Sequence, residues 1–195
     1  MCALVIAAPM RLEAALIRGV VRGARVHTTG MGERRSRVSA GLLAEQPGEG
    51  VLVLGFCGGL DERARPGDVV VAEEVWAGDQ QEGAERIRCD AAPQLAAAVT
   101  GNGMRVRCGP VVSVAKIALG ERRAQLHAAG AIAVDMESAW LAAGKRDRPL
   151  GVVRVVLDSP SHELLRPSIV ISAPRAARAL RRVAAAAVNG WEPGG

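Results

Sequence analysis

The chain has 195 residues, a net charge of +5 and a residue content that is 49% hydrophobic. This length supports one folded domain with a sizeable core, and the apolar content excludes a disordered chain. No apolar run reaches the roughly 18 residues of a membrane-spanning helix. The first apolar run also lacks the basic start of a signal peptide. We therefore expect a single cytoplasmic domain over residues 1–195.

The basic residues are almost all arginine and are dispersed along the chain, with lysine only at Lys116 and Lys145. A nucleic-acid-binding surface usually concentrates its positive charge and interleaves aromatic residues, whereas this chain has no Tyr and one Phe. We expect no nucleic-acid partner. Membrane contact through the arginine-rich C-terminal helix is less favoured than a solvated helix face. The cysteines and histidines lack metal-ligand spacing, so we expect no metal and no cofactor.

Apolar runs alternate with helical patterns along the chain. Strands are predicted at residues 3–8, 26–29, 51–54, 68–75, 105–114, 131–134 and 150–157; helices at 11–19, 33–43, 92–100, 122–129, 137–143 and 174–188; and a polar loop at 82–90. Near-continuous Val, Ile and Leu strands that alternate with helices predict an α/β fold with a largely parallel central sheet.

Unusual residue clusters follow several of the predicted strands. Glycines stand at 30–32 and 55–59, the pair Met136-Glu137 follows one apolar run, and Asp158 follows another. In open α/β sheets, ligands bind beyond the carboxyl ends of the strands. We therefore expect an active site where these clusters meet.

Each cluster also has a purely structural interpretation. The glycines at 55–59 either let the backbone approach a ligand or form a tight turn. Glu137 is either a pocket carboxylate or a helix N-terminal acid that complements the helix dipole. Asp158 is either a pocket acid or the first residue of a turn. For Asp135 we favour a structural role, and for Cys57, which has no evident base partner, buried packing.

Arg154 lies in the middle of a predicted buried strand. A buried arginine needs an acidic partner. We expect it to orient Asp158 or another pocket carboxylate, and an exposed arginine on an edge strand is the alternative.

Several motifs occur together in one order along the chain: residues 30–32, 53–59 followed by 66–72, 133–139 with its Met-Glu pair, and 153–158 with its Arg-x-x-x-Asp pattern. Together they resemble the nucleoside phosphorylase and nucleosidase superfamily, the group of purine nucleoside phosphorylase and methylthioadenosine/S-adenosylhomocysteine nucleosidase. Lys116, Leu119 and residues 130–138 are similar to the hopanoid-associated phosphorylase branch, thought to act on an adenosine-bearing hopane.

The resemblance implies a three-layer α/β/α fold with a central mixed, largely parallel sheet, and cleavage of the N-glycosidic bond of an adenosine-type nucleoside. It implies that Asp158 protonates or hydrogen-bonds N7 of the purine, with its pKa raised by a dry pocket. Glu137 would accept hydrogen bonds from the ribose hydroxyls. The remaining implied substrate-contacting residues are Met136 against the ribose, Phe56, Cys57 and Gly58 along base or sugar, Ile117 near the base, and Arg154 beside Asp158.

The attacking group is ambiguous within the resemblance. Arg11 and Gly32 match a phosphate-binding arrangement, which would make inorganic phosphate a co-substrate, whereas Glu13 stands near the water-activating glutamate of hydrolytic relatives. Leu54 replaces a second phosphate-binding arginine, and Phe56 replaces a hydroxyl residue. These departures favour hydrolysis.

Leu157 is a further departure, because it stands where relatives often have Ser beside the catalytic Asp. Together with Phe56 it leaves open the alternative of a non-catalytic, nucleoside-binding relative. The resemblance also implies a homo-oligomer, with a dimer as the expected state.

Overall fold

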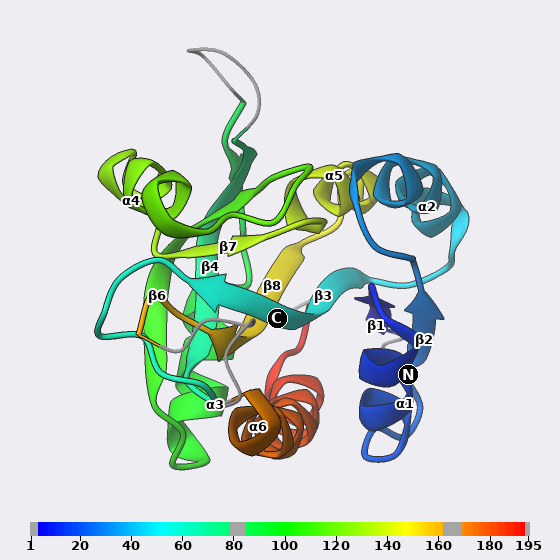
Figure 1. The fold of residues 1–195 in the computed structure, drawn as a ribbon. Helices are drawn as coiled ribbons and strands as arrows, with labels where there is room; N and C mark the ends of the chain where they lie inside the picture. Colours follow the sequence, from blue (N-terminus) through cyan, green and yellow to red (C-terminus); the bar gives the residue numbers. More distant parts are fainter. Residues whose placement is uncertain (1–3, 79–84, 162–168, 194–195) are drawn as a thin grey trace.

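The computed structural model describes residues 4–78, 85–161 and 169–193. Within these ranges one mixed sheet of eight strands has helices on both of its faces (Figure 1). The elements are β1 (Leu4–Ala8), α1 (Arg11–Arg18), β2 (Arg25–Thr28), α2 (Glu33–Glu45), β3 (Gly50–Gly59), β4 (Val69–Ala77), β5 (Ile87–Arg88), α3 (Ala92–Gly101), β6 (Val106–Ser113), α4 (Gly120–Ala128), β7 (Ala133–Asp135), α5 (Ser138–Ala142), the short 3-10 helix η1 (Ala143–Lys145), β8 (Leu150–Asp158) and α6 (Ile169–Gly190).

The sheet closes partly on itself. Its strands follow the order β2-β1-β3-β7-β6-β4-β5, and β8 pairs with both β3 and β4. The strands β3, β8, β4, β6 and β7 therefore form a closed ring, from which β1 and β2 extend. Five of the strand pairs are parallel, and the pairs β3–β7, β4–β5 and β4–β8 are antiparallel. The predicted mixed, largely parallel sheet is confirmed.

The helices form the two outer layers. Helices α1, α3 and α6 lie on one side of the sheet, and α2, α4 and α5 lie on the other (Figure 1). In α6, Leu180 and Val183 are fully buried, whereas Arg178, Arg181 and Arg182 are exposed. The predicted amphipathic C-terminal helix thus packs on the core through an apolar face, and the three-layer α/β/α architecture is confirmed.

Two predicted boundaries are wrong. Part of the predicted polar loop 82–90 forms β5, because Ile87 and Arg88 pair with Val75 and Glu74 of β4; residues 82–84 lie outside the described ranges. The C-terminal helix begins at Ile169 rather than at 174, so Pro174 lies inside it. Proline lacks an N–H, so the helix loses one backbone hydrogen bond there.

The strand predicted at 51–54 is also longer than expected, because β3 continues through the glycines to Gly59. These glycines are strand residues rather than a turn, and their missing side chains leave room for close neighbours. A Cβ atom at Gly59 would overlap the Cβ of Ala64, and one at Gly55 would lie 2.6 Å from Glu13 Oε1. The sequence therefore uses glycine in β3 where other groups press against the backbone.

Within the described ranges, no helix combines the length and the apolarity needed to cross a lipid bilayer.

Gly59→Ala tests this packing. The added methyl meets Ala64, whose Cβ is fixed to the backbone, so we expect the free energy of unfolding to fall by about 1–3 kcal/mol. Gly41→Ala is the matched control, because Gly41 lies inside α2 with no heavy atom within 4 Å of the added Cβ. It should be neutral or stabilise by up to about 1 kcal/mol. Urea unfolding of both variants measures the difference, and equal stabilities would contradict this explanation.

Candidate active site

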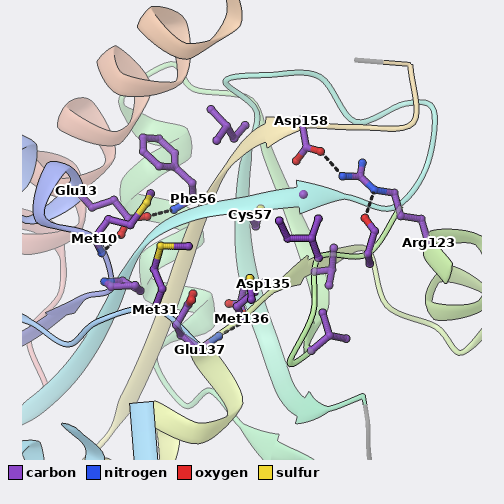
Figure 2. A pocket seen from close by; sticks show the side chains of 17 residues that line it. Met10, Glu13, Met31, Phe56, Cys57, Arg123, Asp135, Met136, Glu137 and Asp158 are labelled. Carbon is purple, nitrogen blue, oxygen red and sulfur yellow. Dashed lines mark hydrogen bonds and ion pairs between the residues drawn. The ribbon is translucent and has the colours of Figure 1, made fainter. Parts of the chain in front are cut away.

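One cavity lies at the carboxyl ends of β3, β7 and β8 (Figure 2). Most of its wall is apolar, and its charged groups are few. It is lined by Pro9, Met10, Glu13, Met31, Phe56, Cys57, Gly58, Val114, Ile117, Ala118, Arg123, Val134, Asp135, Met136, Glu137, Leu157 and Asp158. An apolar cavity with a few convergent polar groups is typical of a small-molecule site.

The strand register explains why distant acids meet in this cavity. Gly58 of β3 pairs with Val134 of β7 on one side and with Asp158 of β8 on the other. Because β7 runs antiparallel to β3 and β8 runs parallel to it, the two strands pass Gly58 in opposite directions. Glu137, just after β7, and Asp158, at the end of β8, therefore both line the cavity beside Gly58. The expected convergence of the two strand-end acids is present in the structure.

Glu13 enters the cavity from α1. Its Oε2 accepts the N–H of Met10 at 2.6 Å, as in a capping box at the helix start, and its Oε1 accepts the N–H of Phe56 at 2.7 Å. The side chain is only 1% exposed. Burial raises the pKa of Glu13, although Arg154 and the two backbone N–H groups oppose the shift. A fixed carboxyl with a raised pKa is a stronger base than an ordinary glutamate.

Glu137 is the N-cap residue of α5. Its Oε1 accepts the N–H of Gly32 at 3.1 Å, and its Oε2 lies 3.7 Å from Arg154 Nη2. Burial raises the pKa of Glu137 to about 7, with Asp135 adding to the shift and Arg154 opposing it. The carboxylate thus lies on the cavity wall with part of its acceptor capacity available.

Asp135 has a structural role, as expected. Its Oδ1 accepts hydrogen bonds from Ser113 Oγ at 2.5 Å and from the N–H groups of Glu137 and Ser138 at 3.1 Å each. These bonds hold the start of α5 and thereby fix the direction of Glu137.

Arg154 does not orient Asp158, so the placement that the resemblance implied is wrong, whereas the expectation that it pairs with another pocket carboxylate is confirmed. Its Nη2 lies 2.9 Å from Asp135 Oδ2, and it donates to Ser138 Oγ from Nε at 3.1 Å and from Nη2 at 2.9 Å. It is completely buried and is not among the described residues that line the cavity. Its side chain points from β8 toward Ser138 of α5. There its positive charge compensates the carboxylates of Asp135, Glu137 and Glu13.

The ion-pair partner of Asp158 is Arg123 of α4. Both side chains are 3% exposed and both line the cavity. Sequence reasoning missed Arg123, because an arginine in a predicted amphipathic helix has the pattern of a surface residue. No local signal distinguishes it from its neighbour Arg122, which is exposed.

The other predicted substrate-contacting residues also reach the cavity. Phe56, Cys57 and Gly58 line it from β3, Met136 lines it from the segment after β7, and Ile117 lines it from the segment before α4. Burial raises the pKa of the Cys57 thiol far above its ordinary value, so the thiolate needed for a nucleophile is disfavoured. This agrees with a packing role.

The two predicted phosphate-binding residues are not brought together in the cavity. Arg11 is exposed at the first position of α1, and the N–H of Gly32 is donated to Glu137. Neither belongs to the described residues that line the cavity. Among the residues that the structure describes, no group of three or more His, Cys, Asp or Glu side chains is arranged to hold a metal ion.

Comparison with solved structures identifies the fold. Futalosine hydrolase of Helicobacter pylori strain 26695 is 18% identical with a TM-score of 0.85, covering 97% of this chain and 98% of that chain. The 5′-methylthioadenosine/S-adenosylhomocysteine nucleosidase of Neisseria meningitidis, in complex with methylthio-immucillin-A, is 20% identical with a TM-score of 0.81, covering 98% of this chain and 100% of that chain. The S-adenosylhomocysteine nucleosidase of Streptococcus pyogenes, in complex with 5-methylthiotubericidin, is 20% identical with a TM-score of 0.75, covering 94% and 96%.

A search of curated protein sequences gives no match. The sequence model of the phosphorylase superfamily matches residues 13–189. The match begins inside α1 and ends one residue before the end of α6. The chain therefore belongs to the phosphorylase superfamily.

Proposed function

We propose that this protein cleaves the N-glycosidic bond of an adenosine-type nucleoside by hydrolysis. One observation carries the proposal: Glu13, Glu137 and Asp158 come from three separate elements and meet in one largely apolar cavity. With Asp135, four buried acids line this cavity, and neighbouring buried carboxylates disfavour each other's ionised forms. Titratable groups perturbed in this way cluster at functional sites.

Glu137 and Asp158 contact different parts of the substrate. Glu137 accepts hydrogen bonds from the ribose hydroxyls, and Met136 packs beside it on the sugar. Asp158 lies at the opposite end, near Arg123, and contacts the purine; Figure 2 supports this separation, with Asp158 and Arg123 on one side and Glu13 and Met10 on the other. The apolar wall around Phe56 would hold base and sugar away from water.

Glu13 activates the attacking water. Its two oxygens are held by the N–H groups of Met10 and Phe56, so the carboxyl has a fixed direction. Because burial raises its pKa, it retains enough basicity to take a proton from water during attack on the sugar.

Hydrolysis is favoured over phosphorolysis by the placement of the basic residues. Arg11 is exposed outside the cavity, and Leu54, which replaces a phosphate-binding arginine of the relatives, is fully buried. The basic residue that does line the cavity, Arg123, is paired with Asp158. A doubly charged phosphate would enter a cavity that is lined by the carboxyl groups of Glu13 and Glu137.

The group on the 5′ carbon of the ribose is apolar in this proposal. Met10 lines the cavity beside Glu13 and Met31 lines it beside Glu137 (Figure 2), and thioether side chains adapt to apolar groups of varied shape. A methylthio group or the hopane chain implied by the sequence resemblance would meet this wall.

We also propose that the protein is a homodimer. Val38 and Leu42 lie one turn apart on α2 and are 65% and 64% exposed, and Met31 just before this helix is 48% exposed. Covering such an apolar surface with a second copy would remove it from water.

A panel of 5′-substituted adenosines, assayed by chromatography for released base with and without phosphate, tests the activity. We expect adenine release that does not depend on phosphate, and a loss of about 10²-fold or more in kcat for Asp158→Asn. Binding by calorimetry without turnover would instead support a non-catalytic relative, and wild-type rates for Asp158→Asn would contradict the assignment of this acid.

Glu13→Gln separates water activation from binding. The amide keeps the shape of the side chain but takes no proton, so we expect kcat to fall by about 10²–10⁴-fold with KM little changed. Glu45→Gln, at a site 71% exposed in an ion pair with Arg146, is the control and should be fully active. A phosphate-dependent product that survives Glu13→Gln and is lost in Arg11→Ala would mean that the reaction is a phosphorolysis.

The pH dependence of kcat/KM tests Glu137. Its pKa is raised to about 7, so the ionised form that accepts ribose hydrogen bonds is lost as the pH falls through this value. We expect kcat/KM to rise between pH 6 and pH 8, because this parameter reports the ionisations of the free enzyme. Glu137→Gln should be less active and should lack the midpoint near pH 7; an unchanged profile would assign that midpoint to another group.

A further inference from the structure

Arg123 is a buried cation at the base end of the cavity. It belongs to α4, is 3% exposed and lines the cavity next to Asp158. An arginine with this burial is uncommon unless its donors are satisfied. The hydrogen bonds and the ion pair of its guanidinium therefore bear on its role in the cavity.

The guanidinium of Arg123 is fixed by three different segments. Nε donates to the carbonyl of Ala118 at 2.9 Å, Nη1 donates to the carbonyl of Gly59 at 3.2 Å, and Nη2 pairs with Asp158 Oδ2. A guanidinium has five N–H donors. These bonds use one donor on each nitrogen, which leaves one N–H on Nη1 and one on Nη2 outside these bonds.

Arg123 also compensates the negative charge of Asp158. A cation in direct contact favours the ionised carboxylate, and an ionised carboxylate only accepts hydrogen bonds. In this arrangement the positive charge at the base end belongs to Arg123 rather than to a proton on Asp158.

Gly58 brings this pair against the cavity wall. A Cβ atom there would lie 3.1 Å from Asp158 Oδ1 and 3.2 Å from Arg123 Nη2, so an acceptor and a donor lie side by side over bare backbone. The N7 edge of adenine presents an acceptor, N7, beside a donor, the N6 amino group. The two edges are complementary when Arg123 donates to N7 and Asp158 accepts from the amino group.

We propose that Arg123 is a further catalytic residue, which donates a hydrogen bond to N7 of the leaving purine and stabilises its negative charge. This rests on the proposed function. The water oxygen bonds to C1′ of the ribose as the bond from C1′ to N9 breaks, and the electron pair of that bond passes into the purine. Glu13 takes the water proton and returns it to solvent, and the departed purine anion takes a proton from solvent. One water is consumed.

A preorganised cation is worth most where charge develops in a water-excluded site. The variants Arg123→Met and Arg123→Lys test this role, with Arg107→Met as the matched control. Arg107 also forms an arginine–aspartate pair, with Asp61, but is not among the described residues of the cavity. For an adenosine-type substrate, we expect kcat to fall by about 10²–10³-fold in Arg123→Met and less in Arg123→Lys, and to stay near the wild-type rate in Arg107→Met.

A second substrate separates catalysis from folding. With 4-nitrophenyl β-D-riboside the leaving group stabilises its own charge, so Arg123→Met should lose far less activity than with the nucleoside. A structural defect would lower both rates alike, and that result would overturn the proposal. If Arg123→Met does not fold, the two substrates are compared in Arg123→Lys, which keeps a cation beside Asp158.

The pH profile of kcat distinguishes the two sources of charge. If Arg123 supplies it, kcat of the wild type stays level from pH 7 to pH 9; a decline over this range that is absent in Asp158→Asn would mean that Asp158 donates a proton. If the wild type and Arg107→Met release no base from any nucleoside, the proposed function itself fails. If both are active and Arg123→Met equals them, only the role of Arg123 fails.

Discussion

The buried guanidinium of Arg154 is the interaction on which the site depends. It lies in the middle of β8 with no exposed surface, 2.9 Å from Asp135 and 3.7 Å from Glu137, and its charge also acts on Glu13. Each of these carboxylates would cost several kcal/mol to bury without compensation. One cation therefore makes it possible to place three acids at one end of the sheet, and the remaining imbalance appears as the raised pKa values of Glu13 and Glu137.

Strand β3 serves as the surface on which these groups are assembled. Gly55 leaves room for Arg154 Nη1 and Glu13 Oε1, and Gly58 leaves room for Asp158 and Arg123. Two charge clusters thus lie along the same strand: the Arg154 cluster, with Asp135, Glu137 and Glu13, and the Arg123–Asp158 pair beside Gly58. Both clusters are held by arginines, whose planar guanidinium groups satisfy several acceptors at once.

The sequence predicted the layers and most elements because its strands are continuous apolar runs and its helices have apolar faces. It also predicted that Glu137 and Asp158 meet, since both follow such runs. It did not predict the partners of these acids. Arg154 was assigned to Asp158 or another pocket carboxylate, but the sequence did not show that the register of β8 shifts just before Asp158 or that α5 places Asp135 beside Arg154. Arg123 lies 35 residues before Asp158, and only the position of α4 in the fold, from which Arg123 reaches the carbonyl of Gly59, brings the two together. The glycines of β3 were compatible with both a turn and a strand, because what they accommodate comes from other elements.

The closed ring of strands has a consequence for the behaviour of the protein at high concentration. Sheet edges with unpaired backbone groups are templates for edge-to-edge aggregation. Since β3, β8, β4, β6 and β7 close on one another, the ends of the strand order are β2 and β5. The former has four residues and the latter has two, and both carry arginine, at Arg25 and Arg88. Short charged edges of this kind offer little length for intermolecular pairing, so the long apolar strands that carry the site are kept away from such contacts.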